Sequence, residues 1–167
     1  HSYEVAFLAS SLTKLVPGTV AGECFLAGLF HDMGRIIFFM MDYDRFLGIA
    51  SWDDMPDQER AAYGCTHAEA GTWLAESLGI PKPLIPPIAF HHHPLEAKEQ
   101  KDLVAVIALA EGFSRRFSPR IEDDGIWTAE HDDLLKRYSI SDDKLEAIGD
   151  RLVEARPEIE SMFIARR

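Results

Sequence analysis

The feature that most constrains this chain is an apolar segment, residues 21–41, with two adjacent polar residues at its middle. Its central part reads "GLFHDMGRIIF" (28–38) and sets His31 and Asp32 among side chains of the kind that form cores. An imidazole or carboxylate buried without a partner is costly, so such groups normally pair with another group or bind a metal ion. The segment therefore predicts a buried helix, with a partner or ligand for the polar pair inside the protein.

Helical periodicity continues along nearly the whole chain, and no stretch reads as a convincing strand. Apolar residues recur every three or four positions in 2–16, until Pro17-Gly18 ends that helix. Thr66 with Glu69 forms a capping-box pattern that begins another helix, which stops at 79–81. The pattern predicts an all-α bundle. Further helices are expected over 21–41, from Gln58, over 88–93 after Pro87, and over 101–117, 128–138 and 142–154 with a last turn from Pro157; 42–57 is expected to hold a short helix and a loop, and 118–127 a loop.

Composition and charge narrow the class of protein. A chain of 167 residues is expected to form one domain. Its net charge of -11 argues against a broad surface for nucleic acid or an anionic membrane, although a local cation could hold a small anionic ligand. The longest candidate for a membrane span, 24–41, is interrupted by charged and polar residues, so no membrane partner is expected. Cys24 and Cys65 are isolated, which favours thiols in a reducing cytoplasm over a disulfide framework.

Six of the seven histidines precede residue 94, and each lies beside an apolar stripe. Imidazoles and carboxylates from several helices of one bundle are a recurrent way to build an inward-facing metal site. Nitrogen and oxygen ligands without thiolate favour Fe, Mn, Mg or Zn. Arg35 shares the helix face of His31 and Asp32, where a guanidinium would suit a phosphate.

Simpler interpretations of the same residues remain open from the sequence. Each histidine alone could be a hydrogen-bonded core residue, and Arg35 could simply neutralise Asp32 as an ion pair within the helix. His93, next to a proline, is expected to point outward, and His131, in the charged run "AEHDD", is expected on the surface. The pair Met40-Met41 is expected to fill the core.

Five motifs, taken in order, resemble one known family. They are "HSYEVA", "AGLFHDMGRIIF", "ERAAYGCTHAEAGTWLAESLGIP", "PPIAFHHHP" and the helix "VIALAEGF". The pattern resembles the HD superfamily of metal-dependent phosphohydrolases and, more closely, the HDOD family, which is related to HD-GYP domains. The resemblance covers residues 1 to about 117 closely and 118–167 loosely. It implies an HD-domain-like helical bundle over 1–167, and a further helical half before His1, since the chain begins at that residue without Met.

The resemblance also implies a ligand set and the departures from it. One or two divalent metal ions are implied, with Asp32 bridging and Arg35 in the place of the usual lysine. Glu111 stands where many HD proteins have Asp, one methylene shorter, and the GYP motif of cyclic-di-GMP phosphodiesterases is absent. The implied ligands are His1, His31, Asp32 and Glu111 for a first metal, and His67, His91 and His92 for a second.

Three functions follow from these residues. The favoured one is a bacterial signal-transduction module that keeps a hydrolase-like metal site and contacts a regulatory partner domain or protein. The second is an active phosphohydrolase acting on a nucleotide or other phosphoester, in which Asp32 orients or deprotonates the nucleophile and Arg35 stabilises charge on the phosphate. The third is a helical scaffold without metal. Because fold alone does not decide function, metal content is the discriminating measurement.

Overall fold

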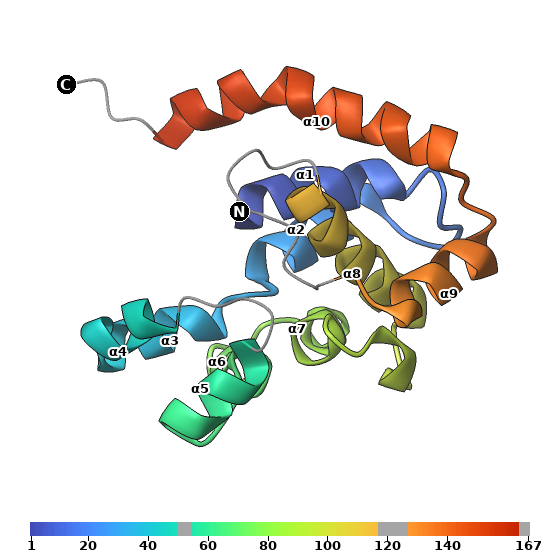
Figure 1. The fold of residues 1–167 in the computed structure, drawn as a ribbon. Coiled ribbons are helices and arrows are strands. Elements are labelled where there is room, and N and C mark those ends of the chain that lie inside the picture. Colours follow the sequence, from blue (N-terminus) through green and yellow to red (C-terminus); the bar gives the residue numbers. More distant parts are fainter. Residues whose placement is uncertain (50–54, 117–126, 164–167) are drawn as a thin grey trace.

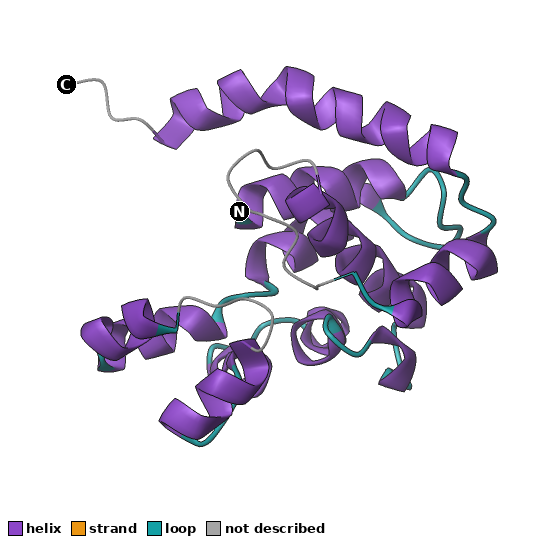
Figure 2. Ribbon diagram, in the orientation of Figure 1, coloured by secondary structure: helices purple, strands orange, loops and turns teal. Residues whose placement is uncertain are grey.

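The computed structural model describes residues 1–49, 55–116 and 127–163 (Figure 1). This described part is helical and contains no strand, which confirms the predicted all-α class (Figure 2). The expected loop at 118–127 lies almost wholly outside the described residues, as do 50–54 of the expected loop at 42–57. The elements are α1 (Ser2–Leu12), α2 (Ala21–Phe30), α3 (Gly34–Met41), α4 (Tyr43–Gly48), α5 (Met55–Tyr63), α6 (His67–Ser77), η1 (Lys82–Leu84), α7 (Ile85–Phe90), η2 (Pro94–Glu96), α8 (Lys101–Arg116), α9 (Ala129–Tyr138) and α10 (Asp142–Phe163).

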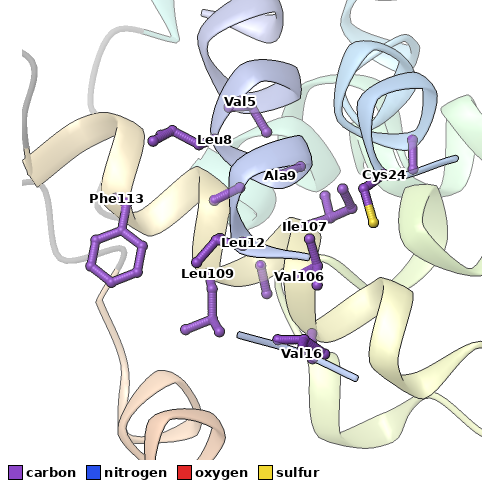
Figure 3. Packing of buried hydrophobic residues seen from close by; sticks show 14 of the residues in the cluster. Val5, Leu8, Ala9, Leu12, Val16, Cys24, Val106, Ile107, Leu109 and Phe113 are labelled. Atoms are coloured by element: carbon purple, nitrogen blue, oxygen red, sulfur yellow. The ribbon is translucent and has the colours of Figure 1, made fainter. Parts of the chain in front are cut away.

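Helix α8 is the centre of the apolar core. Every residue from Leu103 to Ser114 is buried, so this helix is covered on all sides, as a central helix must be. It packs against α1, α2, α7 and α9, while α10 lies across α1 (Figure 1). Side chains such as Leu12, Ile107 and Leu109 meet between α1 and α8 (Figure 3). We call this region, built from α1, α2 and α8, the α8 core.

A second region, formed by α3, α4, α5 and α6, extends to one side of the α8 core (Figure 1). Helix α3 packs on α6, and α6 packs on α7, which in turn contacts α8. Few apolar side chains are buried here: Phe38 of α3 and Met55 of α5 are buried, and α4 buries none of its residues. We call this region the α3–α6 arm.

Two glycines allow the helices to approach closely where the site forms. A Cβ on Gly28 of α2 would meet the backbone of Ala6 in α1, with its Cα only 2.7 Å away. A Cβ on Gly34, the first residue of α3, would overlap the backbone carbonyl oxygen of His67. Because the atoms in the way are backbone, no side-chain movement could make room for a larger residue. The glycines therefore set the contacts of α1 with α2 and of α3 with α6.

The segment 21–41 is not the single buried helix that the sequence predicts. It breaks at residues 31–33 into α2 and α3, so the polar pair lies at a corner of the backbone. Its length would suffice for a membrane span, as would the mean hydropathy of 1.4 of its most apolar 18-residue stretch. However, 44% of that stretch is buried inside the protein. Met40 and Met41, expected in the core, are 78% and 69% exposed. Apolar composition alone did not distinguish the two faces of α3.

Other helix boundaries agree with the sequence in part. The capping box of Thr66 and Glu69 is present at the start of α6, and α1 ends at Leu12, four residues before the predicted end. Helix α7 ends at Phe90, so His91 and His92 follow it in a turn. Helix α10 continues through Pro157 to Phe163, whereas an end before Pro157 was expected. Leu152 and Ile159 are buried on either side of the proline, which holds both parts of α10 on the core.

Candidate metal centre

The seven predicted ligands come together, and most of them lie at helix ends. His1 precedes α1, the pair His31-Asp32 fills the corner between α2 and α3, and His67 is the first residue of α6. His91 and His92 follow the last residue of the short α7, and Glu111 lies in the interior of α8. We call the set the His/carboxylate centre: His1, His31, Asp32, His67, His91, His92 and Glu111.

Asp32 lies at the middle of this centre. Its side chain is 10% exposed, and its two oxygens face histidines from four different parts of the chain. The distances from its carboxylate oxygens to ring Nε2 atoms are 3.7 Å for His1, 3.6 Å for His31, 3.4 Å for His67 and 3.8 Å for His91. A carboxylate with two oxygens in this position has the geometry to bridge two sets of ligands.

One such set is a triad of histidines. The Nε2 atom of His67 lies 3.1 Å from Nε2 of His91 and 2.9 Å from Nε2 of His92. One nitrogen of each ring lies within 4.8 Å of those of the other two. Three imidazole nitrogens directed at one another in a buried site are a donor set suited to a divalent transition metal.

The other set combines residues from α8 and from the ends of α1 and α2. His1, His31 and Glu111 each offer a ligand atom within 4.8 Å of the others, and Asp32, His91 and Glu111 form a group of the same kind. The Ser114 hydroxyl, one turn after Glu111 on α8, lies 3.3 Å from Nδ1 of His1. Glu111 therefore reaches the centre despite its additional methylene, and Ser114 holds the first residue beside it.

The hydrogen bonds of the rings orient their donor atoms inward. Nδ1 of His31 lies 2.7 Å from the Gly28 carbonyl oxygen, and Nδ1 of His91 lies 2.9 Å from that of Ile88. A carbonyl only accepts, so each Nδ1 carries the proton and each Nε2 keeps its lone pair. Nε2 of His31 is buried and has no hydrogen-bond partner among the residues that the structure describes. This orphaned nitrogen and the mixed nitrogen and oxygen donors fit a divalent metal ion.

Positive charge around the two carboxylates of the centre favours their ionised form. Burial alone would raise the pKa of Asp32, but the nearby charges of three histidine rings and Arg35 hold it well below its usual range. Burial would likewise raise the pKa of Glu111, yet His92, His91 and His31 lower it to about 2. The interior of the bundle thus holds two negative charges, which a cation would compensate.

The three histidines of the triad differ in the net direction in which their pKa is shifted. Burial lowers the pKa of His91 and His92, and neighbouring histidines lower it further against the opposing charge of Glu111, so the neutral, donating form of both rings is favoured. Burial also acts to lower the pKa of His67, but a hydrogen bond to Glu59 and the charge of Asp32 raise it overall. Neutral rings are the form that binds a metal.

The predictions for Arg35 and for the two histidines outside the centre, His93 and His131, can each be compared with the structure. Nη1 of Arg35 lies 3.8 Å from Asp32, and its guanidinium also lies over the ring of Phe46 at 5.4 Å. His93 is 63% exposed, as predicted, and faces Glu130. His131, predicted on the surface, is buried: it occupies the first turn of α9 and turns toward α8, where its ring stacks on Trp127. A charged run such as "AEHDD" still has an inner face, and His131 lies on it.

Sequence patterns assigned no role to Glu59 of α5. Its side chain is 2% exposed, and it contacts both the backbone and the ring of His67. The only signal was its place at the head of the motif "ERAAYGCTH", among other charged residues.

Solvent reaches the centre at its edge. The side chains of His1 and His92 are 26% and 20% exposed, whereas those of His31, His67 and His91 are buried. A cavity of about 490 Å³ adjoins His92 between α5, α6 and the turn after α7. Its walls include Arg60, Trp73 and Phe90, so it offers aromatic surface and a cation beside the centre.

Comparisons with known proteins agree with this geometry. The model of the HDOD domain family matches residues 1–94. A candidate phosphohydrolase from Shewanella amazonensis has a similar structure, with a TM-score of 0.67 and 26% identity, over 92% of this chain and 57% of that one. A candidate signal transduction protein from Marinobacter aquaeolei gives a TM-score of 0.78 at 16% identity, over 96% of this chain and 38% of that one.

Two further relatives extend the comparison. An HDOD domain protein of unknown function from Geobacter sulfurreducens has a TM-score of 0.63 at 19% identity, over 96% of this chain and 59% of that one. An uncharacterized protein of Treponema pallidum is 27% identical over 118 residues, which are 66% of this chain and 23% of that protein. The chain thus spans less than two thirds of each relative, and the Marinobacter and Geobacter likenesses show the fold alone.

Proposed function

The chain belongs to the HDOD family, and on that premise we propose that it is a signal-transduction module whose centre binds divalent metal ions and a phosphate-containing ligand. The observation that carries the proposal is the convergence of the His/carboxylate centre on Asp32. A scaffold interpretation would not explain why two carboxylates are buried, nor why Nε2 of His31 has no hydrogen-bond partner among the described residues.

The ligands are proposed to divide as two sites that share Asp32. His1, His31 and Glu111 would hold one ion, and the histidine triad would hold the other. Fe, Mn, Mg and Zn all accept such nitrogen and oxygen donors. A bound ion would neutralise charge on a phosphate oxygen and lower the pKa of a water molecule. Arg35 would contribute a fixed positive charge at the edge of the same site.

A nucleotide or other phosphoester is the proposed ligand, and a partner is proposed for the arm. The cavity beside His92 is large enough for a small ligand and has aromatic walls. The exposed apolar side chains of α3 and α4, Met40 and Leu47 among them, would suit contact with a regulatory partner domain or protein. The similarity to a candidate signal transduction protein supports this part of the proposal at the level of the fold.

Elemental analysis of freshly purified protein tests the metal site. One or two divalent ions per chain are expected in the native protein. His31→Ala and His92→Ala should each lower the metal content, while His93→Ala, beside the centre but 63% exposed, should not. A native protein that binds no divalent ion after metal is added back would contradict the proposal.

Hydrolysis of the bound phosphoester is the second candidate function. The observation that favours it is the position of Asp32, ionised and 10% exposed, beside the charge of Arg35. Such a carboxylate can orient or accept a proton from an attacking water. Metal-dependent phosphate release from a panel of nucleotides and phosphoesters is the measurement. Activity should be lost in Asp32→Ala and kept in Asp133→Ala, whose carboxylate is exposed on α9. If the protein binds a phosphoester but releases no phosphate, hydrolysis is rejected and the signalling function remains.

A further inference from the structure

We propose that Glu59 is the positioning residue that holds His67 in the orientation and tautomer needed for metal binding. The inference rests on the proposed metal-binding function. Glu59 lies on α5, eight residues before His67, and it does not reach the centre itself. Its role would be to act through His67 on the histidine triad.

Both hydrogen bonds of Glu59 go to the same residue. Its Oε2 atom accepts from the backbone N–H of His67 at 2.8 Å and lies 2.6 Å from Nδ1 of the His67 ring. The first bond fixes the start of α6, where His67 is the first helical residue. The second fixes the rotation of the ring. Main chain and side chain of one ligand are thus held by one oxygen atom.

The burial of Glu59 is the unusual feature that requires an explanation. Its side chain is 2% exposed, although α5 is otherwise a polar helix, "MPDQERAAY". Burying a carboxylate is costly unless it is paired and hydrogen-bonded. Among the described residues, its hydrogen bonds and ion pair all join it to His67. A carboxylate needed only for stability or solubility would be placed on the exposed face of α5, where Asp57 and Arg60 lie.

The consequence lies on the other side of the ring. A carboxylate oxygen accepts the hydrogen bond, so Nδ1 of His67 carries a proton and the neutral ring presents the lone pair of Nε2. That Nε2 atom lies 3.4 Å from Asp32 and 3.1 Å from His91, inside the centre. A carboxylate behind a histidine ligand fixes its tautomer and makes it a stronger donor.

His67 differs in this respect from its neighbours. Nδ1 of His31 and Nδ1 of His91 bond to backbone carbonyl oxygens within their own turns. Those orienting groups cannot be removed by substitution, and they carry no charge. Glu59 is therefore an orienting group of the histidine triad that can be changed without touching a ligand.

The first measurement needs no metal and begins with the native protein. Ring ¹⁵N chemical shifts of the metal-free protein report which nitrogen of His67 is protonated, and the Nδ1–H form is expected. In Glu59→Ala the ring should become a mixture of forms. An Nε2–H tautomer of His67 in the native protein would overturn the inference, whatever the metal content is.

The second measurement is metal affinity, determined by titrating Zn²⁺ or Mn²⁺ into the metal-free protein. Glu59→Ala should weaken binding roughly 10- to 100-fold, the usual effect of losing such an orienting group. Glu59→Gln keeps an oxygen that accepts from His67 without the charge, so it should recover part of the loss. It also keeps the inference testable if the Ala variant does not fold. Native affinity in Glu59→Gln together with native affinity in Glu59→Ala would overturn the inference.

Glu69→Gln is the matched control. Glu69 lies on the first turn of the same helix as His67, accepts from the Thr66 N–H at 2.8 Å and is 43% exposed. It supports the start of α6 without touching the centre, and glutamine preserves the capping box. Its metal affinity should be native. A native protein that binds no metal but has the Nδ1–H tautomer would reject the proposed function and keep the orienting contact, so the two failures are distinguishable.

Discussion

The α8 core and the α3–α6 arm are held together by different forces. In the α8 core, α1 and α8 bury apolar side chains on nearly every turn, so the hydrophobic effect stabilises it without any ligand. The arm buries few apolar residues, leaves Met40 and Met41 in solvent, and places its most buried polar groups, Glu59 and His67, toward the centre. The comparison teaches that the core determines the fold, whereas the centre secures the arm.

Truncation in the α8 core should have the largest effect on stability. Leu12 is fully buried between α1 and α8, and Leu12→Ala should lower the free energy of unfolding by about 2–5 kcal/mol. Met41→Ala, in the arm and 69% exposed, should change it by no more than about 0.5 kcal/mol. Urea denaturation of both variants measures the difference. Equal losses would mean that the arm is as tightly packed as the core.

Metal removal should act on the arm before the core. A ligand present at about 100 times its dissociation constant stabilises by about 2.7 kcal/mol, and that stabilisation is lost on chelation. Hydrogen exchange should become faster in α3 and α6, which carry or adjoin centre residues, and should change little in the middle of α8. Uniform acceleration over all helices would show that the two regions unfold as one.

A methyl group between α3 and α6 should displace the arm. Gly34→Ala would put a Cβ onto the backbone of His67 and Gly71, at a cost of about 1–3 kcal/mol. It should also weaken metal binding, because His67 would move away from Asp32. Gly22→Ala on α2 is the control, since its Cβ would meet no atom within 4 Å. Calorimetry and metal titration together test the pair, and a native metal affinity in Gly34→Ala would contradict the close contact.

Acid should weaken the centre by a smaller, graded amount. Burial lowers the pKa of His91 and His92 in the folded protein, so the unfolded chain binds more protons below the usual value of 6.5. The stability from these rings is present above that pH and is lost as pH falls. The raised pKa of His67 opposes this trend, because its contribution is lost as pH rises.

Thermal melting of the metal-free protein between about pH 7 and about pH 5 measures the balance, because unperturbed histidine titrates near 6.5. The melting temperature should fall toward pH 5. His92→Gln should make that fall shallower, and His93→Gln, an exposed neighbour, should leave it as it is. A native slope in His92→Gln would mean that burial of this ring is not what weakens the centre in acid.

Helical periodicity was sufficient to predict the all-α class, whereas the set of residues that meet in the centre was implied by the resemblance to the HDOD family. Helical periodicity records which face of each helix is buried, and it places His31, His67 and His92 beside apolar stripes. It was not sufficient for residues whose burial depends on a neighbouring element. Glu59 stands among other charges on α5, and only the contact with α6 decides which carboxylate turns inward.

Dependence on neighbouring elements also explains the other differences between the sequence-based predictions and the structure. Composition does not state which apolar face of α3 is covered, so Met40 and Met41 were expected in the core and are exposed. The corner at 31–33 has no proline and no helix-ending motif, and it follows from packing against α6. Pro157 was expected to follow the end of α10, but burial on both sides of it keeps the helix continuous.

The corner between α2 and α3 has a mechanical consequence. The two residues that turn the backbone there are the ones whose side chains face the interior, and α3 runs from that corner to Met41 at the solvent-facing end. Because α3 begins at that corner, a change in the backbone angles there would move its Met41 end farther than its Gly34 end. The exposed apolar end of α3 is therefore the part of that helix most sensitive to the backbone geometry beside the centre.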